Sequence, residues 1–310
     1  MASTAGDVVL AYLARRVAEV RRLAPGAAAG RVEDIHQMRV AVRRLRSVLG
    51  SCHSLFDGSA VDPLRDELRW LSGVLGAARD PGVVRDRLLE AAAREPAALR
   101  WAGDPAADLI RTRLDADAAA GLAAAADALT GARYERLLAA IDTCLADPPL
   151  APAAADPPLA PAAAAPARRV HRAVRRDSKR LVRTAAALAE ANGGAEHDVV
   201  LHTVRKAAKR LRYSAELMLE AVPDGPTKRL KYARRAAKGA RTVQQVLGLH
   251  QDSVMARSVL VELARESDPG AGAGSAVGFG LGRLHAAEDV RAAAAEKKFH
   301  KSWRRLRRKL

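Results

Sequence analysis

One helical pattern occurs twice in the sequence, and this duplication constrains the fold more than any other feature. The copies span residues 35–46 and 201–212. In each copy apolar residues recur at the i, i+3, i+7 spacing of a buried helix side, and cationic residues follow the same spacing one position later. One residue is about 100° of rotation about a helix axis, so each cationic stripe flanks an apolar stripe. The apolar stripes are Ile35, Met38, Val42, Leu45, Leu49 and Leu201, Val204, Ala208, Leu211, Ala215; the cationic stripes are His36, Arg39, Arg43, Arg46 and His202, Arg205, Lys209, Arg212.

A second pair of segments supports the duplication. Residues 75–80 read Leu-Gly-Ala-Ala-Arg-Asp, and residues 247–252 read Leu-Gly-Leu-His-Gln-Asp. The two histidines that begin the stripes are 166 positions apart, and Asp80 and Asp252 are 172 apart, so the order is kept with a small length change. The sequence therefore predicts two similar halves.

The composition predicts an all-α protein. Aromatic residues make up only 3% of the chain and hydrophobic residues 49%, with abundant Ala, which suits packed helices better than a sheet. We expect a first helix that ends at Pro25-Gly26, a helix break at residues 103–105 and a glycine-rich loop at residues 270–282. The domain prediction is a first helical bundle at 7–146, a Pro/Ala-rich linker at 147–167 and a second bundle at 168–310.

The formal charge of +17 and the pI of about 10.7 predict a polyanionic partner: nucleic acid, an anionic membrane or polyphosphate. Cys52 and Cys144 have neither the number nor the spacing of a disulfide framework or a zinc site, so we expect both to be reduced and structural. No signal peptide and no run of about 18 apolar residues is present, which predicts a soluble, cytoplasmic protein without a membrane span.

Each cationic stripe could be a solvated helix face or a binding surface. Solvated faces mix charges of opposite sign, because like charges at i, i+4 destabilise a helix by some tenths of a kcal/mol per pair. Neither stripe contains a carboxylate, so the repulsion between like charges is present in both copies. This favours a binding surface. Arginine suits phosphate oxygens because its planar guanidinium donates two hydrogen bonds and stays charged.

At these residues the sequence resembles the CHAD family, the conserved histidine α-helical domain, whose signature is a duplicated His-x-x-Arg-Val-x-x-(Arg/Lys)-Arg-Leu-Arg helix. The match runs from about Asp7 to the C-terminus and departs from the pattern at Lys206, where the first copy has Val40. The resemblance implies two antiparallel four-helix bundles related by pseudo-two-fold symmetry around a basic central cavity. It also implies binding of inorganic polyphosphate, with granule targeting, storage and regulation of a partner as the possible outputs. Many relatives carry a triphosphate-hydrolysing domain with a Glu-x-Glu-x-Lys signature, which this sequence does not contain.

On this basis we predict a set of polyphosphate-binding residues in the two stripes and in the segment that follows the second. Asp80 and Asp252 are predicted to support them, either by orienting arginines or histidines or by capping helices. His36 and His202 could contact the ligand or orient a neighbour. The predicted binding residues are His36, Arg39, Arg43, Arg44, Arg46, His202, Arg205, Lys206, Lys209, Arg210, Arg212, Lys231, Arg234, Arg235 and Lys238.

Other functions have less support in the sequence. A nucleic-acid-binding helical protein is the main alternative, but the stripes lack the aromatic, Asn and Gln side chains that stack on or read bases. The dipeptide His197-Asp198 is found in metal-dependent phosphohydrolases, yet the further ligands of such a site are not found around it. No phosphate loop, nucleophile set or carboxylate cluster is apparent, so we expect no cofactor, no metal and no enzymatic activity.

Overall fold

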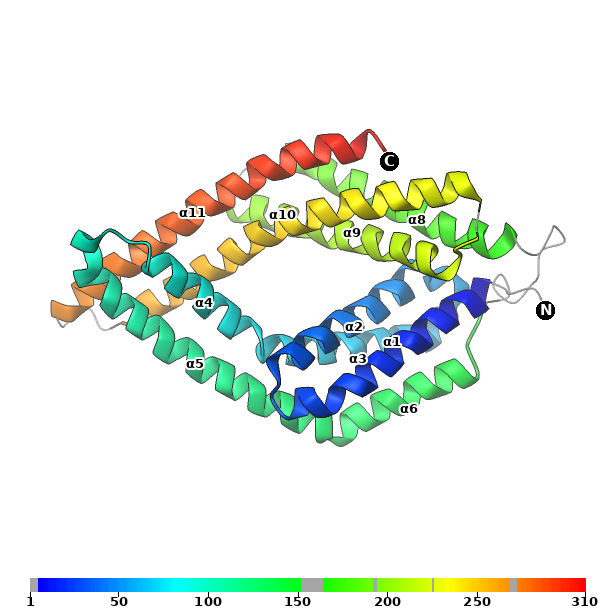
Figure 1. Cartoon of the computed structure of the whole chain (residues 1–310), viewed down its shortest axis with the longest axis horizontal. Helices are drawn as coiled ribbons and strands as arrows, with labels where there is room; N and C mark the ends of the chain where they lie inside the picture. Colours follow the sequence, from blue (N-terminus) through cyan, green and yellow to red (C-terminus); the bar gives the residue numbers. More distant parts are fainter. Residues whose placement is uncertain (1–4, 152–163, 192–193, 225, 268–271) are drawn as a thin grey trace.

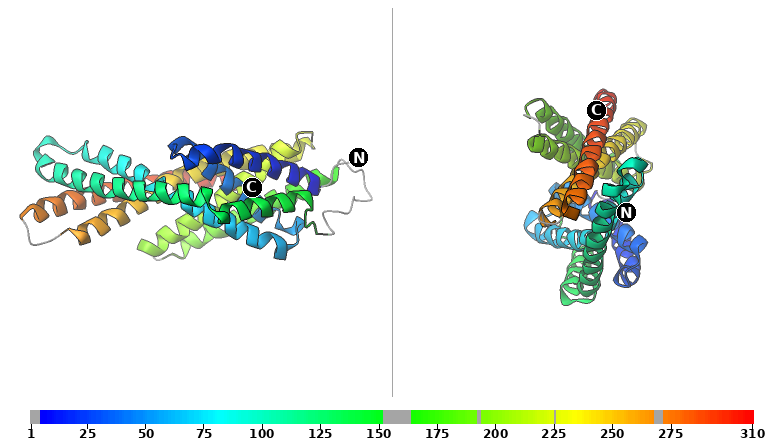
Figure 2. Two further views of the ribbon diagram at one scale, coloured as in Figure 1. Left: turned by 90° about the horizontal axis from the view of Figure 1, so that it is seen from below. Right: turned by 90° about the vertical axis from the view of Figure 1, so that its left-hand side faces the viewer.

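The structure, a computed structural model, describes residues 5–151, 164–191, 194–224, 226–267 and 272–310, which form an elongated assembly of helices (Figures 1 and 2). The first half contains α1 (Ala5–Ala28), α2 (Val32–Ser51), α3 (Gly58–Ala77), α4 (Asp80–Ala92), α5 (Arg100–Thr130) and α6 (Ala132–Ala146). The second half contains α8 (Ala164–Ala186), α9 (Gly194–Ala221), α10 (Thr227–Glu266) and α11 (Gly272–Arg307). The described part of the chain also forms three short 3₁₀ segments: η1 (His53–Leu55), η2 (Ala97–Leu99) and η3 (Ala187–Ala189). The described residues contain no β-strand, and the all-α prediction is confirmed.

The two striped segments form α2 and α9, and their apolar stripes are buried. Ile35, Met38 and Val42 on α2 are each at most 1% exposed, and so are Leu201 and Val204 on α9. Burying a large aliphatic side chain contributes about 1.5 to 3 kcal/mol, which is more than like charges on one helix face cost. The apolar stripes therefore fix the orientation of both helices, and this orientation determines the direction in which the cationic side chains point.

The hydrophobic cores are shared between the two halves. The main core joins α1, α2 and α3 to α8, α9 and the N-terminal part of α10. A second core lies at the other end of the molecule, where Leu88 of α4 and Ile110 of α5 pack with Leu260 of α10 and Leu284 of α11 (Figure 1). The division into bundles at 7–146 and 168–310, with pseudo-two-fold symmetry, stays a prediction; the packing shows helices from both halves in each core.

Three predicted helix ends are wrong. Helix α1 continues to Ala28 through Pro25, and α5 passes without a break through residues 103–105, where Ala102 and Ala106 are fully buried. Packing of this α5 face outweighs the hydrogen bond that Pro105 cannot donate. The predicted loop at 270–282 is helical from Gly272 onward, although residues 268–271 lie outside the described part of the chain. Glycine is tolerated here because α11 approaches α5 closely: a Cβ on Gly280 would overlap the carbonyl oxygen of Ala102.

The predicted linker is shorter than expected and is partly packed. The backbone nitrogen of Asp57 donates to the carbonyl oxygen of Pro149 at 2.8 Å, the nitrogen of Ala151 donates to the carbonyl of Leu55 at 3.0 Å, and Leu150 packs against the main core. Residues 152–163 lie outside the described residues, and α8 begins at Ala164 rather than after 167. A proline at position 166 is accommodated because the first helical turn has N–H groups without intrahelical partners.

Replacing Gly280 with Ala should destabilise the protein by about 1 to 3 kcal/mol, because the added methyl group would force α11 away from the backbone of α5. Chemical unfolding monitored by circular dichroism measures this change. Gly282→Ala is the matched control, since nothing lies within 4 Å of its Cβ position and alanine favours helix by up to about 1 kcal/mol. Equal stability of the two variants would show that the α5–α11 approach is looser than described.

Candidate polyanion-binding site

The cationic stripes of α2 and α9 converge where these two helices pack against each other. We use the name inner cluster for Arg39, Arg43 and Arg46 of α2 together with Arg205 and Lys209 of α9. Burial is the largest cause that lowers the pKa of Lys209, and the positive charges of the four arginines lower it further, to about 7. This coupling shows that the two stripes, far apart in sequence, face one another in the fold.

Three arginines of the inner cluster are, like Lys209, partly buried and close to other cationic side chains. Burial lowers the pKa of Arg43, of Arg46 and of Arg205, and neighbouring arginines add to the effect. Guanidinium groups still remain charged at physiological pH. The Nε atoms of Arg39, Arg43 and Arg205 are buried, and none has a hydrogen-bond partner among the described residues. Such donors cost about 1 to 3 kcal/mol each when no acceptor is supplied, so the inner cluster is suited to an anionic ligand.

Asp80 and Gly76 place Arg39. The Arg39 guanidinium donates to both carboxylate oxygens of Asp80, with 2.8 Å between Nη2 and Oδ2. A Cβ at Gly76 would lie 3.3 Å from Nη2 of Arg39, so the absence of a side chain there lets the guanidinium lie against α3. Asp80, which the sequence predicts to support the binding residues, therefore forms a direct ion pair with Arg39.

Gly248 and Asp252 lie close to Arg205, although Asp252 interacts with it only electrostatically and not through an ion pair like that of Asp80. A Cβ at Gly248 would lie 3.6 Å from Nη2 of Arg205. Burial raises the pKa of Asp252, whereas the positive charge of Arg205 opposes this rise. Each Leu-Gly-x-x-x-Asp segment thus lies beside the first arginine of the cationic stripe in its own half of the sequence. Residues 75–80 lie beside Arg39, and residues 247–252 lie beside Arg205.

The two histidines lie at the ends of the stripes. His202 Nδ1 and Gln251 Oε1 are 2.5 Å apart, and burial is the main cause that lowers the pKa of His202. Burial also lowers the pKa of His36, with a further contribution from Arg79, and Nδ1 of His36 is buried without a partner in the described chain.

Several predicted binding residues have other surroundings. Arg210 points to α8, where its Nε donates to Asp177 at 2.9 Å, and it also donates to the carbonyl of Gly50. Arg212 pairs with Glu216 at 2.7 Å, so a carboxylate does extend the second stripe. Arg44 lies near Tyr12, whose pKa its charge lowers against the larger effect of burial. The exposed members of the predicted set are Lys206 on α9 and Lys231, Arg234, Arg235 and Lys238 on α10.

Sequence reasoning missed three residues beside the inner cluster. Arg65 and Arg69 of α3 lower the pKa of Arg46, after the larger effect of burial. Tyr213 of α9 is 3% exposed and interacts electrostatically with Arg43 and Arg205. The sequence contains a pattern that could have identified Arg65 and Arg69. Each directly follows a leucine that is buried, just as the cationic residues of the two stripes directly follow apolar residues.

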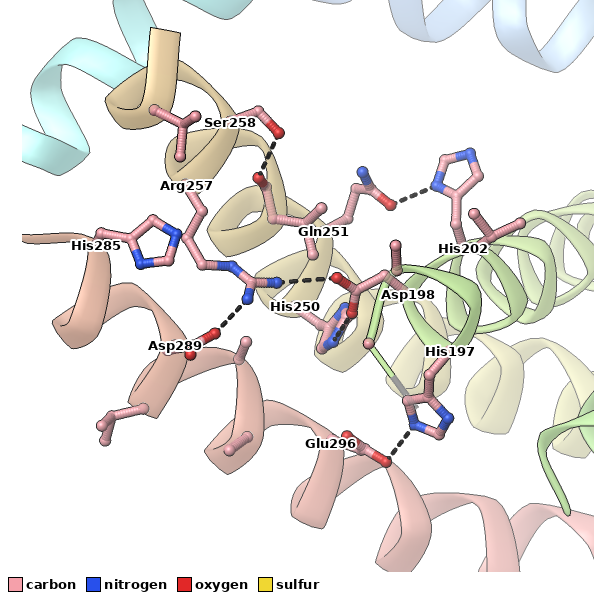
Figure 3. A pocket seen from close by; sticks show the side chains of 18 of the residues that line it. His197, Asp198, His202, His250, Gln251, Arg257, Ser258, His285, Asp289 and Glu296 are labelled. Atoms are coloured by element: carbon pink, nitrogen blue, oxygen red, sulfur yellow. Dashed lines mark hydrogen bonds and ion pairs between the residues drawn. The ribbon is translucent and has the colours of Figure 1, made fainter. Parts of the chain in front are cut away.

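A pocket of about 1230 Å³ lies between the N-terminal part of α9, α10 and α11, next to His202 (Figure 3). His197 pairs with Glu296 at 2.7 Å, and Asp198 pairs with Arg257 at 2.9 Å and with the buried His250 at 3.3 Å. Across the described residues no group of three or more His, Cys, Asp or Glu side chains could hold a metal ion. The His197-Asp198 dipeptide is thus engaged by other side chains of its own chain.

The cysteines and the helices do not suggest another kind of site. Cys52 is buried, Cys144 is partly buried and both are free thiols. Burial raises the pKa of the Cys52 thiol to about 12, which opposes formation of a reactive thiolate. Among the described helices, none is long and apolar enough to cross a membrane.

Comparison with known proteins identifies the family. A model of the CHAD domain matches residues 11–261, and the chain therefore belongs to the CHAD domain family. The uncharacterized proteins MT2285 and Rv2226 of Mycobacterium tuberculosis, strains CDC 1551 / Oshkosh and ATCC 25618 / H37Rv, are each 33% identical over 241 residues, which is 75% of this chain. The chain spans about 40% of the length of these curated relatives.

Two solved structures share the fold. PptA from Streptomyces chartreusis superposes with a TM-score of 0.76 at 23% identity, over 97% of this chain and all of that one. The CHAD domain from the plant Ricinus communis gives a TM-score of 0.68 at 27% identity, over 96% of this chain and 92% of that one. The helical arrangement is therefore that of a known CHAD domain structure.

The pKa of Lys209 leads to a pH prediction. In the free protein this amine loses its proton as the pH rises through about 7, and a bound polyanion would raise its pKa. Complex formation should then take up a proton above pH 7, and affinity should fall by up to about tenfold per pH unit. Titrations with a polyphosphate between about pH 7 and 9 test this, because histidines with an ordinary pKa near 6.5 are already neutral there. Lys209→Arg should flatten the profile; an unchanged profile in that variant would assign the pH dependence to another group.

Proposed function

We propose that this protein binds inorganic polyphosphate at the inner cluster. The observation that supports the proposal most is the set of buried guanidinium Nε groups of Arg39, Arg43 and Arg205, which have no acceptor among the described residues. Phosphate oxygens are strong acceptors, and a charge-assisted hydrogen bond contributes about 1.5 to 3 kcal/mol. A polyphosphate chain would also place negative charge beside Lys209 and favour its protonated form.

The family supports the same ligand. CHAD resemblance implies polyphosphate binding in a basic central cavity, and two converging cationic helices are what such a cavity requires. A cytoplasmic protein that associates with polyphosphate granules follows from this proposal.

The structure also supports a narrower set of contact residues than the full predicted set. Arg39, Arg43, Arg46, Arg205 and Lys209 would contact the ligand, with Tyr213 beside them. Arg210 would hold α8 to α9 through its ion pair with Asp177, and Arg212 would hold α10 to α9 through its hydrogen bond to Gln244. Asp80 and Asp252 would orient Arg39 and Arg205.

The double variant Arg43→Gln with Arg205→Gln should lose affinity for polyphosphate by about 1.5 to 3 kcal/mol per removed contact. Isothermal titration calorimetry with a fractionated chain measures this loss, and circular dichroism checks helicity. Arg22→Gln with Arg136→Gln removes the same charge from exposed positions and serves as the control. If both double variants lost the same affinity, general electrostatic attraction would explain binding and the inner cluster would not be the site.

A competition assay distinguishes the main alternative. Polyphosphate, double-stranded DNA and RNA are compared at equal phosphate concentration and stated salt, with the Arg43→Gln, Arg205→Gln protein in parallel. Preferential displacement of a labelled probe by polyphosphate, lost in the double variant, is the expected result.

We further propose that binding is not followed by hydrolysis or phosphoryl transfer. Incubation of polyphosphate with the protein and magnesium or manganese should leave the chain-length distribution on a gel unchanged. Chain shortening that was abolished by Asp198→Asn would instead assign a phosphohydrolase activity to the pocket of Figure 3.

A further inference from the structure

The positive charge of the chain is concentrated outside the inner cluster. Segments 168–183, 227–241 and 297–309 contain 23 of the 52 lysines and arginines but only one of the 35 carboxylates, Asp177. The remainder of the chain contains 29 cationic and 34 acidic residues, so it is net negative even though it includes the inner cluster. These three segments therefore account for the whole excess of positive charge.

The fold brings the three segments together around Tyr232. Its hydroxyl group donates to Ser178 on α8 at 2.7 Å, and its ring lies 4.9 Å from the guanidinium carbon of Arg175. Arg175 in turn donates to the backbone carbonyl of Leu310 at 3.1 Å. Figure 1 shows the N-terminal part of α10 and the C-terminal end of α11 on the side of the molecule away from α3 and α6; α8 packs against α10 and also against α1. We call the cationic side chains of these segments the outer basic face.

The outer basic face is exposed and its charge is not compensated within its own segments. Every lysine and arginine in it is exposed except Arg169 and Arg229, which are partly buried. Asp177 is fully buried against Ser51 and Arg210, so it presents no negative charge at the surface. Repulsion among so many like charges favours the capture of an external polyanion.

The chemistry of the face decides among polyanions. None of the exposed large hydrophobic side chains of the described chain lies in these three segments, which argues against insertion into a membrane and against stacking on single-stranded bases. A single polyphosphate chain is one line of charge. Because α10 packs against both α11 and α8, the three segments instead present a broad face, which matches the two phosphate rows of a duplex.

We propose that the outer basic face binds double-stranded nucleic acid through its phosphate backbone, without reading base sequence. This site is separate from the inner cluster and is additional to the proposed binding of polyphosphate. Phosphate contacts of this kind confer affinity and strong salt dependence but little sequence preference.

The test uses the full chain and a labelled duplex of about 30 bp, with fluorescence anisotropy at several salt concentrations between about 50 and 200 mM. The outer variant replaces two exposed cations on each segment by glutamine, none of them in the predicted polyphosphate-binding set: Arg172, Lys179, Lys228, Arg241, Arg304 and Arg308. The control variant removes the same charge from exposed positions elsewhere: Arg22, Arg94, Arg100, Arg111, Arg136 and Arg265.

The outer variant should lose at least about tenfold in duplex affinity, and its log–log salt slope should fall by about 0.9 for each phosphate contact removed. The control variant and the Arg43→Gln, Arg205→Gln protein should keep both quantities. The outer variant should also keep its affinity for polyphosphate, so failure of either proposal can be recognised separately.

Three results would overturn the proposal. Equal losses in the outer and control variants would reduce duplex binding to net charge, and loss in the inner double variant alone would place the duplex at the inner cluster. Unchanged duplex affinity in the outer variant, together with reduced binding to phosphatidylserine vesicles, would make the face a membrane-binding surface.

Discussion

The close approach of two cationic helix stripes is the constraint on which the rest of the structure depends. Lys209 lies among four arginines in partly buried surroundings, an arrangement that is unfavourable in itself. It persists because the adjacent apolar stripes are buried in a core shared by both halves, and each large side chain there contributes about 1.5 to 3 kcal/mol. Asp80 offsets part of the repulsion at Arg39. The hydrophobic core thus holds the basic groups in a geometry that they would not adopt alone.

The cationic stripes were predictable from the sequence, but the membership of the inner cluster was only partly so. Periodicity identifies which residues share a helix face, and it placed Arg43 and Lys209 correctly beside the buried positions. It cannot say which neighbouring helix each side chain meets. Arg210 follows Lys209 directly, yet it pairs with Asp177 because α8 packs on that side of α9. Arg65 and Arg69 enter the site because α3 packs on α2, which no local pattern specifies.

Helix ends are the least predictable feature, because glycine and proline favour helix breaks locally whereas tertiary packing decides whether the helix continues. Helix α5 continues through Pro105 since the buried residues on either side of it stabilise the helix more than one missing hydrogen bond destabilises it. Gly280 of α11 is explained by its contact with α5 rather than by a turn. In both cases the partner helix comes from a distant part of the chain.

The uneven distribution of charge has a consequence for the kinetics of association. The whole positive excess of the chain lies in the outer basic face and the remaining residues are net negative, so the long-range field is positive overall and strongest on that side of the molecule. A nucleic-acid duplex that diffuses toward the protein is therefore oriented before contact and meets this face first, at a rate that falls steeply with ionic strength. The lifetime of a complex depends instead on short-range hydrogen bonds, which salt screens much less when they are buried. Speed of capture and duration of binding can thus be set by different residues of one small helical protein.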